Sequence, residues 1–445
     1  MDIFVFRLGV LALLCAASVT AQTVDDTELK QVIIFGRHGV RTPNSPNILL
    51  NTFSTQQFPV FPDLPGDPSD NPTSMLTSNG AAAETLLGGY FRLWLIQQGL
   101  LTGGDAADAQ NVYFRADDAP LIIDTAQAFA SGLLPAATLA INTISPSTSD
   151  ALFDPVDAGV ALLDEAKVVA AVNGRLGSNP QALATAYAAE LGLIRSVLFN
   201  YPVNQTPVPP TPTNKMDVTA IPITVSAGNS QLPVSLGGLQ AVALAIDPFV
   251  MEYTDGLPAS QVAWGQLTAG GISQVFRVYD RLLNLEFGTP YIATVQNSNL
   301  ASHIVRSLVQ AATGNAMTGA IASPSTKVIV LTASNFNIVG LASLLHLDWL
   351  LPGYQPDVAA PGGALVFQLR QSQSTGEFVV RIAYVSQTMD QLRNLTQLSL
   401  TAPPPSAPVA IPGCITGNAN LDCPLGRFVE IANEAIDPHS ADFVN

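Results

Sequence analysis

Short apolar runs and longer amphipathic stretches alternate along this chain. An apolar run rich in β-branched residues spans 31–35 and is closed by Gly36, and a similar run spans 327–332, so we predict a buried strand at each. Strands that alternate with helices predict the α/β class, with a mainly parallel sheet and flanking helices. Between the two strands, apolar residues at helical spacing predict helices at 81–98, 125–134, 158–171, 180–198 and 272–283.

The middle of the chain has a different composition. Ala- and Leu-rich helical patterns lie close together from about residue 160 to about residue 200, and a Pro/Thr-rich stretch follows at 202–212. We interpret this part as a smaller helical cap domain at 156–259, inserted into an α/β domain at 22–155 and 260–445. The Ala/Pro-rich segment 401–412 predicts a loop.

The first 21 residues have the order of features that is typical of a signal peptide. Arg7 precedes a short apolar run at 8–17, and small residues follow at 19–21. The run is too short for a membrane span, and no later stretch offers about 20 uncharged apolar residues in a row. We therefore expect a secreted or periplasmic protein without a membrane span, whose mature chain of about 420 residues forms two domains.

Acidic residues outnumber basic ones in this sequence. Charged residues make up 12% of the chain, and 34 acidic against 18 basic residues give a formal net charge of −16. A field of that sign repels nucleic acid and anionic membrane surfaces, so we expect no nucleic-acid partner. A phosphorylated ligand would have to be held by a few local arginines.

The cysteines predict one disulfide. Cys15 lies in the predicted leader, which leaves Cys414 and Cys423 close together in a chain that we expect in an oxidising compartment. A disulfide between these two is our prediction, and two free thiols are the alternative.

The four histidines lie far apart in the sequence and lack HExxH-type spacing, so we predict no metal site and no cofactor. His303 falls in a helical pattern at 300–309 and is interpreted as a structural helix residue. His346 and His439 are interpreted as structural or solvated. Only His38 follows directly on a predicted strand.

The segment 37–43, which follows the first strand, is the strongest chemical signal. It has the sequence Arg-His-Gly-Val-Arg-Thr-Pro, and residues at the carboxyl end of a strand face the ligand crevice of an open α/β sheet. Two guanidiniums beside one imidazole suit a phosphate dianion, because Arg forks match phosphate oxygens and an imidazole nitrogen can attack phosphorus. A basic surface turn is the alternative. We take His38 as the candidate nucleophile and a small anionic, phosphorylated molecule as the expected partner.

With this motif, the chain resembles the histidine acid phosphatases, in particular their bacterial phytase and sugar-phosphatase branch. The resemblance implies a phosphoglycerate mutase-like α/β domain with an inserted helical cap, and the activity of a phosphoric monoester hydrolase. It also implies that His38 is the nucleophile and that Arg37, Arg41 and Thr42 bind the substrate. Further similar segments cover nearly the whole mature chain, among them 76–80, 124–129, 152–155, 348–353, 361–367, 386–389 and 433–435.

Two positions depart from the pattern of that family. The third phosphate-binding arginine of the family falls at Leu121, and its His-Asp pair, which protonates the leaving group, falls at Ser334 and Asn335. We keep Ser334 and Asn335 as candidate substrate-binding residues. A general acid contributes ~10² to 10⁴ in rate and one charge-stabilising group ~3 kcal/mol, so we expect a poor alkyl phosphatase that can still hydrolyse aryl phosphates.

A nearby carboxyl group is the simplest replacement for the missing acid. Asp117 and Asp118 lie close to Leu121 in the sequence, and Asp118 is our speculative general acid. A turn or helix-capping role is the alternative for either aspartate.

The substrate is expected to be smaller or less charged than phytate. The chain has only four lysines, and Leu121, Ile122 and Phe336 make the crevice more apolar than is usual in the family. Three functions stay open: a hydrolase with a His38 phosphoenzyme, a non-catalytic anion-binding protein of the same fold, and an enzyme that uses His38 on a non-phosphate substrate.

Overall fold

A computed structural model gives the structure of the protein. The signal peptide predicted at 1–21 lies outside the residues that it describes. Those residues are 25–62, 64, 70–144, 148–203, 205–414 and 418–442.

The larger domain contains an eight-stranded mixed sheet with the strand order β10-β8-β7-β1-β6-β2-β3, and β9 pairs with β8. The strands β1, β6, β2 and β3 are parallel. Strand β8 runs in the same direction, because the β1–β7 and β7–β8 pairs are both antiparallel. This architecture confirms the predicted α/β class with a mainly parallel sheet. The strands are β1 (Thr27–Arg37), β2 (Val112–Ala116), β3 (Ile141–Asn142), β6 (Val328–Ala333), β7 (Ala364–Ser372), β8 (Phe378–Val385), β9 (Ser406–Val409) and β10 (Cys423–Pro424).

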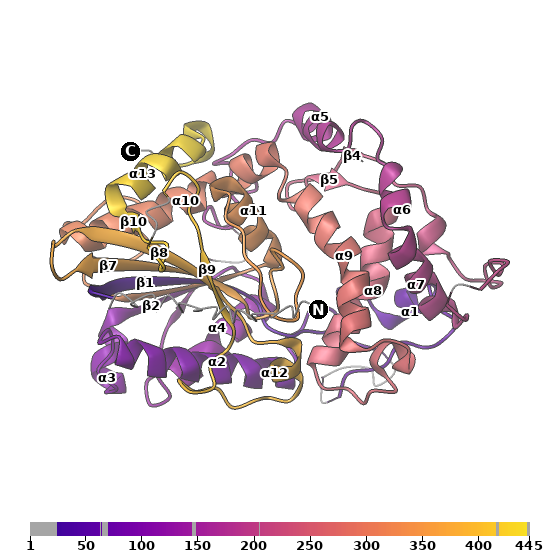
Figure 1. The fold of residues 1–445 in the computed structure, drawn as a ribbon, viewed down its shortest axis with the longest axis horizontal. Helices are drawn as coiled ribbons and strands as arrows, with labels where there is room; N and C mark the ends of the chain where they lie inside the picture. Colours follow the sequence, from indigo (N-terminus) through magenta and orange to yellow (C-terminus); the bar gives the residue numbers. More distant parts are fainter. Residues whose placement is uncertain are drawn as a thin grey trace, which may run out of the picture.

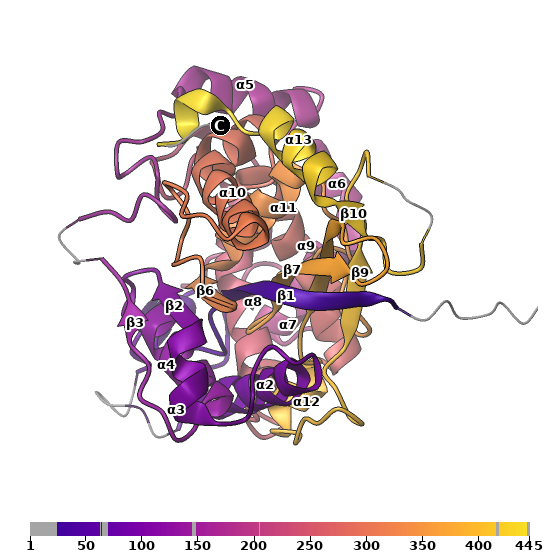
Figure 2. The same ribbon diagram turned by 90° about the vertical axis from the view of Figure 1, so that its left-hand side faces the viewer.

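Helices cover both faces of this sheet (Figure 1). In the view along the sheet, α2, α3, α4 and α12 lie below β1, whereas α10, α11 and α13 lie above it (Figure 2). Alternating residues of β1 are buried on both sides: Ile33 and Phe35 belong to one apolar cluster, and Val32 and Ile34 to the other. The helices are α2 (Ser78–Gln97), α3 (Asp105–Asp108), α4 (Pro120–Leu133), α10 (Pro290–Thr313), α11 (Asn335–Leu345), α12 (Met389–Arg393) and α13 (Leu425–Ala435).

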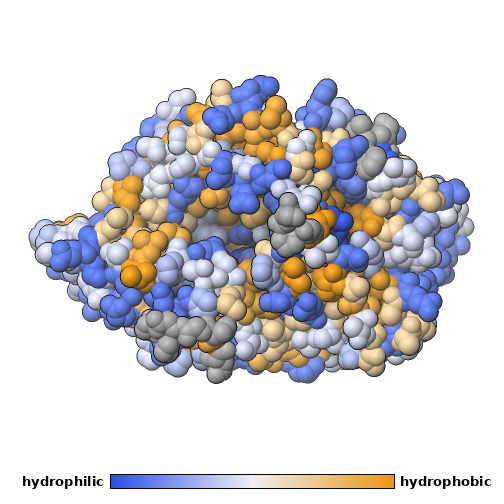
Figure 3. Space-filling view, turned by 180° about the vertical axis from the view of Figure 1, so that it is seen from behind, coloured by the Kyte–Doolittle hydropathy of each residue, from blue (hydrophilic) through white to orange (hydrophobic). Residues whose placement is uncertain are grey.

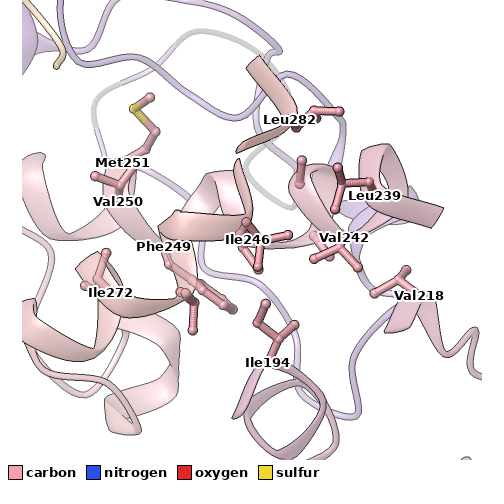
Figure 4. Close-up of a cluster of buried hydrophobic side chains, with 14 of the residues drawn as sticks. Ile194, Val218, Leu239, Val242, Ile246, Phe249, Val250, Met251, Ile272 and Leu282 are labelled. Atoms are coloured by element: carbon pink, nitrogen blue, oxygen red, sulfur yellow. The ribbon is translucent and has the colours of Figure 1, made fainter. Parts of the chain in front are cut away.

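A helical cap packs beside the sheet domain. Its core forms around α8, where Ile246 and Phe249 lie among apolar side chains that include Ile194 and Ile272 (Figure 4). The same cluster takes in Phe58 and other residues outside the predicted cap range of 156–259, because α9 and the segment before α2 pack against α8. The remaining elements are α1 (Asn47–Leu50), α5 (Glu165–Arg175), α6 (Ala182–Ala186), α7 (Ala188–Phe199), α8 (Gly238–Thr254), α9 (Ala269–Glu286) and the short hairpin of β4 (Ser226–Ala227) and β5 (Val234–Ser235).

Three local predictions are wrong in their limits. The helix expected at 158–171 begins only at Glu165, where the Asp164 carboxylate caps its first turn by accepting hydrogen bonds from backbone N–H groups. The helix expected at 180–198 is divided at Tyr187, which lacks helical backbone angles. The loop expected at 401–412 contains β9, because pairing with β8 outweighs the local turn signals.

The predicted disulfide between Cys414 and Cys423 is confirmed, and it ties the segment before β10 to that strand. Within the described part of the chain, we find no helix with the length and apolar character needed to cross a membrane.

Candidate active site

The parallel half of the sheet brings the ends of β1, β6 and β2 to one edge. The backbone N–H of His38 donates to the Ala333 carbonyl at 2.9 Å, and that of Asp117 donates to the Thr332 carbonyl at 3.0 Å. Residues directly after these three strands are therefore close neighbours. Helices α4 and α11 also begin at this edge, and their N-termini favour an anion there.

His38 lies at the centre of this edge and is almost fully buried, with 4% of its surface exposed. Its Nδ1 lies 2.9 Å from the carbonyl oxygen of Gly39, which can only accept a hydrogen bond. Nδ1 therefore carries the proton, and Nε2 keeps its lone pair. Burial lowers the pKa of His38 well below its usual value, and the charges of Arg37 and Arg41 lower this pKa further. The imidazole is thus neutral, as a nucleophile requires.

Arg37 supplies one buried positive charge beside His38. Its Nη1 donates to the Ala359 carbonyl at 2.6 Å, whereas its buried Nε has no hydrogen-bond partner among the described residues. Burial lowers the pKa of Arg37, and the charge of Arg41 acts in the same direction. An anion would satisfy the free donor and offset the burial of this charge.

Arg41 is held by the cap. Its Nη1 and Nη2 donate to the two carboxylate oxygens of Asp247 on α8, at 2.9 and 3.0 Å, and both side chains are buried. Burial by itself lowers the pKa of Arg41, but the charge and hydrogen bonds of Asp247 raise it overall. The next residue, Thr42, is buried and donates through its hydroxyl to the Pro72 carbonyl. The Arg41–Asp247 pair fixes the cap against the loop that carries His38.

The residues directly after β6 are polar, but they carry no acidic group. Ser334 is the N-cap of α11, and its backbone N–H donates to the Asn337 side chain at 3.2 Å. Asn335 is buried, and its Nδ2 lies 3.4 Å from the phenolic oxygen of Tyr279 on α9. Neither Ser334 nor Asn335 titrates in the acidic range, so these residues do not replace a His-Asp pair.

The residues after β2 combine an apolar side chain with a carboxyl group. Leu121 is buried in the first turn of α4 and belongs to the apolar cluster below the sheet. Asp117 is also buried, and burial raises its pKa to about 6. Asp118 is partly exposed, and its backbone N–H donates to the Asp117 carboxylate. Besides burial, the charges of Asp118 and Asp150 raise the pKa of Asp117, and the charge of Arg115 lowers it.

Asp247, Tyr279 and Asp280 are site residues that were not expected from the sequence. All three lie on α8 or α9 of the cap, far in the sequence from the motif after β1. Asp247 had a detectable signal, because an acidic residue followed by Pro248 is unusual in an apolar helix. Tyr279 and Asp280 had none, because only the packing of α9 against the sheet domain brings them to Arg37.

A small cavity of about 40 Å³ lies beside Arg37, between the cap and the sheet domain. Tyr279 and Asp280 contribute polar groups to it, but most of its wall is apolar and includes Phe276 and Pro361. Asp280 also borders a larger cleft of about 530 Å³ between α9 and α11. Seen from behind, the molecular surface is hollowed near its middle (Figure 3).

The other histidines lie away from this edge. His303 on α10 interacts through both ring nitrogens, with the Gly319 carbonyl and with Asp442. His346 is exposed at the end of α11, and His439 is 91% exposed beside Asp437. Among the described residues, no group of three or more metal-ligating side chains could hold a metal ion.

Comparisons with known proteins agree with this geometry. Residues 28–219, which include the segment after β1, match the family described as the histidine phosphatase superfamily, branch 2. Phytase AppA of Escherichia coli (strain K12) is 29% identical to this chain over 443 residues, with 97% of each chain covered. A glucose-1-phosphatase of Salmonella typhimurium is 28% identical, with 95% of this chain and 97% of the relative covered.

The fold and the sequence also agree with a solved phytase. A structure of Hafnia alvei phytase in complex with tartrate superposes with a TM-score of 0.81 at 30% identity, and the match covers 94% of this chain and 99% of the other. This chain therefore belongs to the histidine phosphatase superfamily, branch 2.

Proposed function

We propose that this chain is an exported phosphomonoester hydrolase that acts through a phosphohistidine at His38. The observation that carries the proposal is the neutral Nε2 of His38 in the field of two buried guanidiniums. Membership of a family with relatives named phytase and glucose-1-phosphatase supports the same reaction class.

Each group near His38 has a separate part in the proposed reaction. The Nε2 atom of His38 attacks phosphorus, while Arg37 and the N-termini of α4 and α11 stabilise the charge on the phosphoryl oxygens. Arg41 adds positive charge near His38, and Asp247 holds its guanidinium in position. Water then hydrolyses the phosphohistidine and releases phosphate.

The pocket supports a substrate with fewer phosphate groups than phytate. The cavity beside Arg37 has mostly apolar walls, and it contains the carboxyl group of Asp280 rather than a second cation. A phosphomonoester with a small or apolar leaving group would fit this lining better than a densely charged inositol phosphate. Export is supported by the leader-like sequence at 1–21 and by the disulfide between Cys414 and Cys423.

The test is turnover of p-nitrophenyl phosphate from about pH 3 to about pH 8, by the wild type and by His38→Ala. We expect the variant to lose at least about 10³-fold in kcat, because removal of a nucleophile leaves only binding and electrostatic catalysis. His439→Ala is the matched control, since it removes an exposed imidazole far from the site. Equal turnover by His38→Ala and the wild type would refute the proposal.

The same experiment separates the hydrolase from its main alternative, a non-catalytic anion-binding protein. If the wild type binds phosphate but turns over no phosphomonoester, the protein is an anion-binding relative without catalysis. The buried Arg37 with its free Nε supports binding in either case.

A further inference from the structure

The proposed hydrolase has no acid at the positions where its family places the His-Asp pair, yet an alkoxide leaving group needs a proton. The phenol of Tyr279 lies next to that gap. It accepts a hydrogen bond from the Nδ2 of Asn335 at 3.4 Å, and Asn335 follows the strand whose last residue binds the His38 backbone. The cap thus places a hydroxyl group where the sheet domain lacks a proton donor.

The hydroxyl proton of Tyr279 is available for donation. Because the phenolic oxygen accepts from Asn335, the O–H bond itself is not used in that contact, and Tyr279 has no other hydrogen-bond partner in the part of the chain that the structure describes. Tyr279 shares the wall of the small cavity with Arg37. The charges of Arg37, Arg41 and Asp247 all act on the phenol, which therefore lies near these three groups.

We propose that Tyr279 is the proton donor for the leaving group and the proton acceptor for the attacking water. This inference rests on the proposed function. In the first step, Nε2 of His38 forms the N–P bond, the P–O bond to the leaving group breaks, and the phenol proton passes to the leaving oxygen. In the second step, the oxygen of water attacks phosphorus, its proton passes to the Tyr279 phenolate, and the N–P bond breaks. The sum is ester plus water to alcohol plus phosphate.

The environment keeps this phenol protonated before reaction. Burial raises the pKa of Tyr279, and the charge of Asp247 raises it further, whereas Arg41, Arg37 and the Asn335 hydrogen bond lower it. Donation to a departing alkoxide is nevertheless favourable, because an aliphatic alkoxide is a stronger base than a phenolate. A p-nitrophenolate leaving group needs no such help.

Two carboxyl groups are the rivals for this role. Burial raises the pKa of Asp280 to about 7, although the charge of Arg37 lowers it, and Asp280 also lines the outer cleft. Asp117 is influenced by Asp118, Asp150 and Arg115, and among the described residues no hydrogen bond or ion pair joins its carboxylate to Arg37 or Arg41. Tyr279 is the residue that contacts Asn335 and lies near both guanidiniums.

The experiment compares Tyr279→Phe with the wild type on glycerol 2-phosphate and on p-nitrophenyl phosphate. Loss of a general acid should lower kcat/KM for the alkyl ester by roughly 10²-fold and leave that for the aryl ester within a few-fold. The aryl ester serves as an internal check that the variant is folded. Tyr253→Phe is the matched control, because its phenol contacts Asp390 outside the cavity.

Three results would overturn the assignment. An equal loss on both esters in Tyr279→Phe would indicate a structural role. No loss on either ester would remove Tyr279 from the reaction. A loss selective for the alkyl ester in Asp280→Asn or Asp117→Asn, but not in Tyr279→Phe, would identify the carboxyl group as the donor. The two proposals can fail separately. His38→Ala tests the nucleophile of the proposed function, and Tyr279→Phe tests only the proton donor.

Discussion

Two regions at the same edge of the sheet have opposite characters. After β1, buried guanidiniums and a neutral imidazole converge, and a cap carboxylate holds one of the guanidiniums. After β2 and β6, the corresponding positions hold Leu121, Ser334 and Asn335, which bring neither a positive charge nor a group that titrates in the acidic range. The first region contains what binding and nucleophilic attack need, whereas in the second the positions of the family's third arginine and His-Asp pair carry neither a cation nor an acid.

From this contrast we infer that phosphoryl binding and proton delivery are separable parts of one fold. The nucleophile and the two guanidiniums come from a single short segment, whereas a proton donor can be supplied by a side chain of another neighbouring element. In this chain, α9 of the cap brings the phenol of Tyr279 to Asn335. The changes below weaken the first region or rebuild the second.

The largest effect is expected from removing a charge after β1. Arg37→Ala should lower kcat/KM for p-nitrophenyl phosphate by about 10²- to 10³-fold, or roughly 3–4 kcal/mol, because a buried donor to the transition state is lost. The acidic limb of the pH profile should move to higher pH, since Arg37 lowers the pKa of His38. Arg427→Ala, at an exposed arginine paired with Glu430, is the control. A loss below about threefold would contradict the role given to Arg37.

A smaller effect, on the pH dependence of stability, is expected from Glu84, whose carboxyl group is buried against the loop that carries His38. Glu84 is fully buried against Gly39 and Gly362, its Oε1 has no partner among the described residues, and burial raises its pKa from 4.5 to about 8. A carboxyl whose folded pKa is raised stabilises the fold below the unfolded pKa, and this stabilisation is lost as pH rises toward the folded value. Between about pH 5 and about pH 7, Glu84 should therefore lower the free energy of unfolding of the wild type by about 2–3 kcal/mol.

Glu84→Gln checks this sign. Urea unfolding of the variant should show a weaker fall in stability between those two pH values than the wild type shows. Glu430→Gln is the control, because Glu430 is exposed beside Arg427. The same pH dependence in the Glu84 variant and the wild type would contradict the assignment of a neutral Glu84.

The smallest effect is expected from rebuilding the second region. The double change Ser334→His and Asn335→Asp restores the His-Asp pair of the family, and turnover of glycerol 2-phosphate should rise about tenfold or more, while p-nitrophenyl phosphate changes little. In the double variant, Tyr279→Phe should lower the turnover of glycerol 2-phosphate by a smaller factor than it does in the wild type. The single change Ser334→His is the comparison, and a rise on both esters would mean that the second region does not limit proton delivery.

Much of the fold could be predicted from local patterns. The strand at 31–35, the strand at 327–332 and the helix at 81–98 have strong apolar periodicity, and each lies within or beside an observed element. The strands β7 and β8 were not predicted, although their sequences are also rich in apolar and β-branched residues. Their antiparallel pairing has no local signal, because it depends on partners distant in the sequence.

The site divides in the same way. The segment after β1 was identifiable because its chemistry is contiguous in the sequence. Tyr279 was not, because it reaches the site only through the packing of the cap on the sheet domain. Asp247 had the signal of an acidic residue before Pro248 in an apolar helix, but its pairing with Arg41 depends on the same packing. Asp118 stays a prediction as general acid, and its contact with the Asp117 carboxylate is the interaction that the structure adds.

The most direct test of the account is to detect the covalent intermediate. The wild type and His38→Ala would be mixed with p-nitrophenyl phosphate, quenched in alkali, which preserves phosphohistidine, and analysed by mass spectrometry of the peptide that contains residue 38. We predict a phosphate group on His38 in the wild type and none in the variant. Rapid turnover by the wild type without a trace of phosphorylated His38, or with phosphate on another residue, would contradict it.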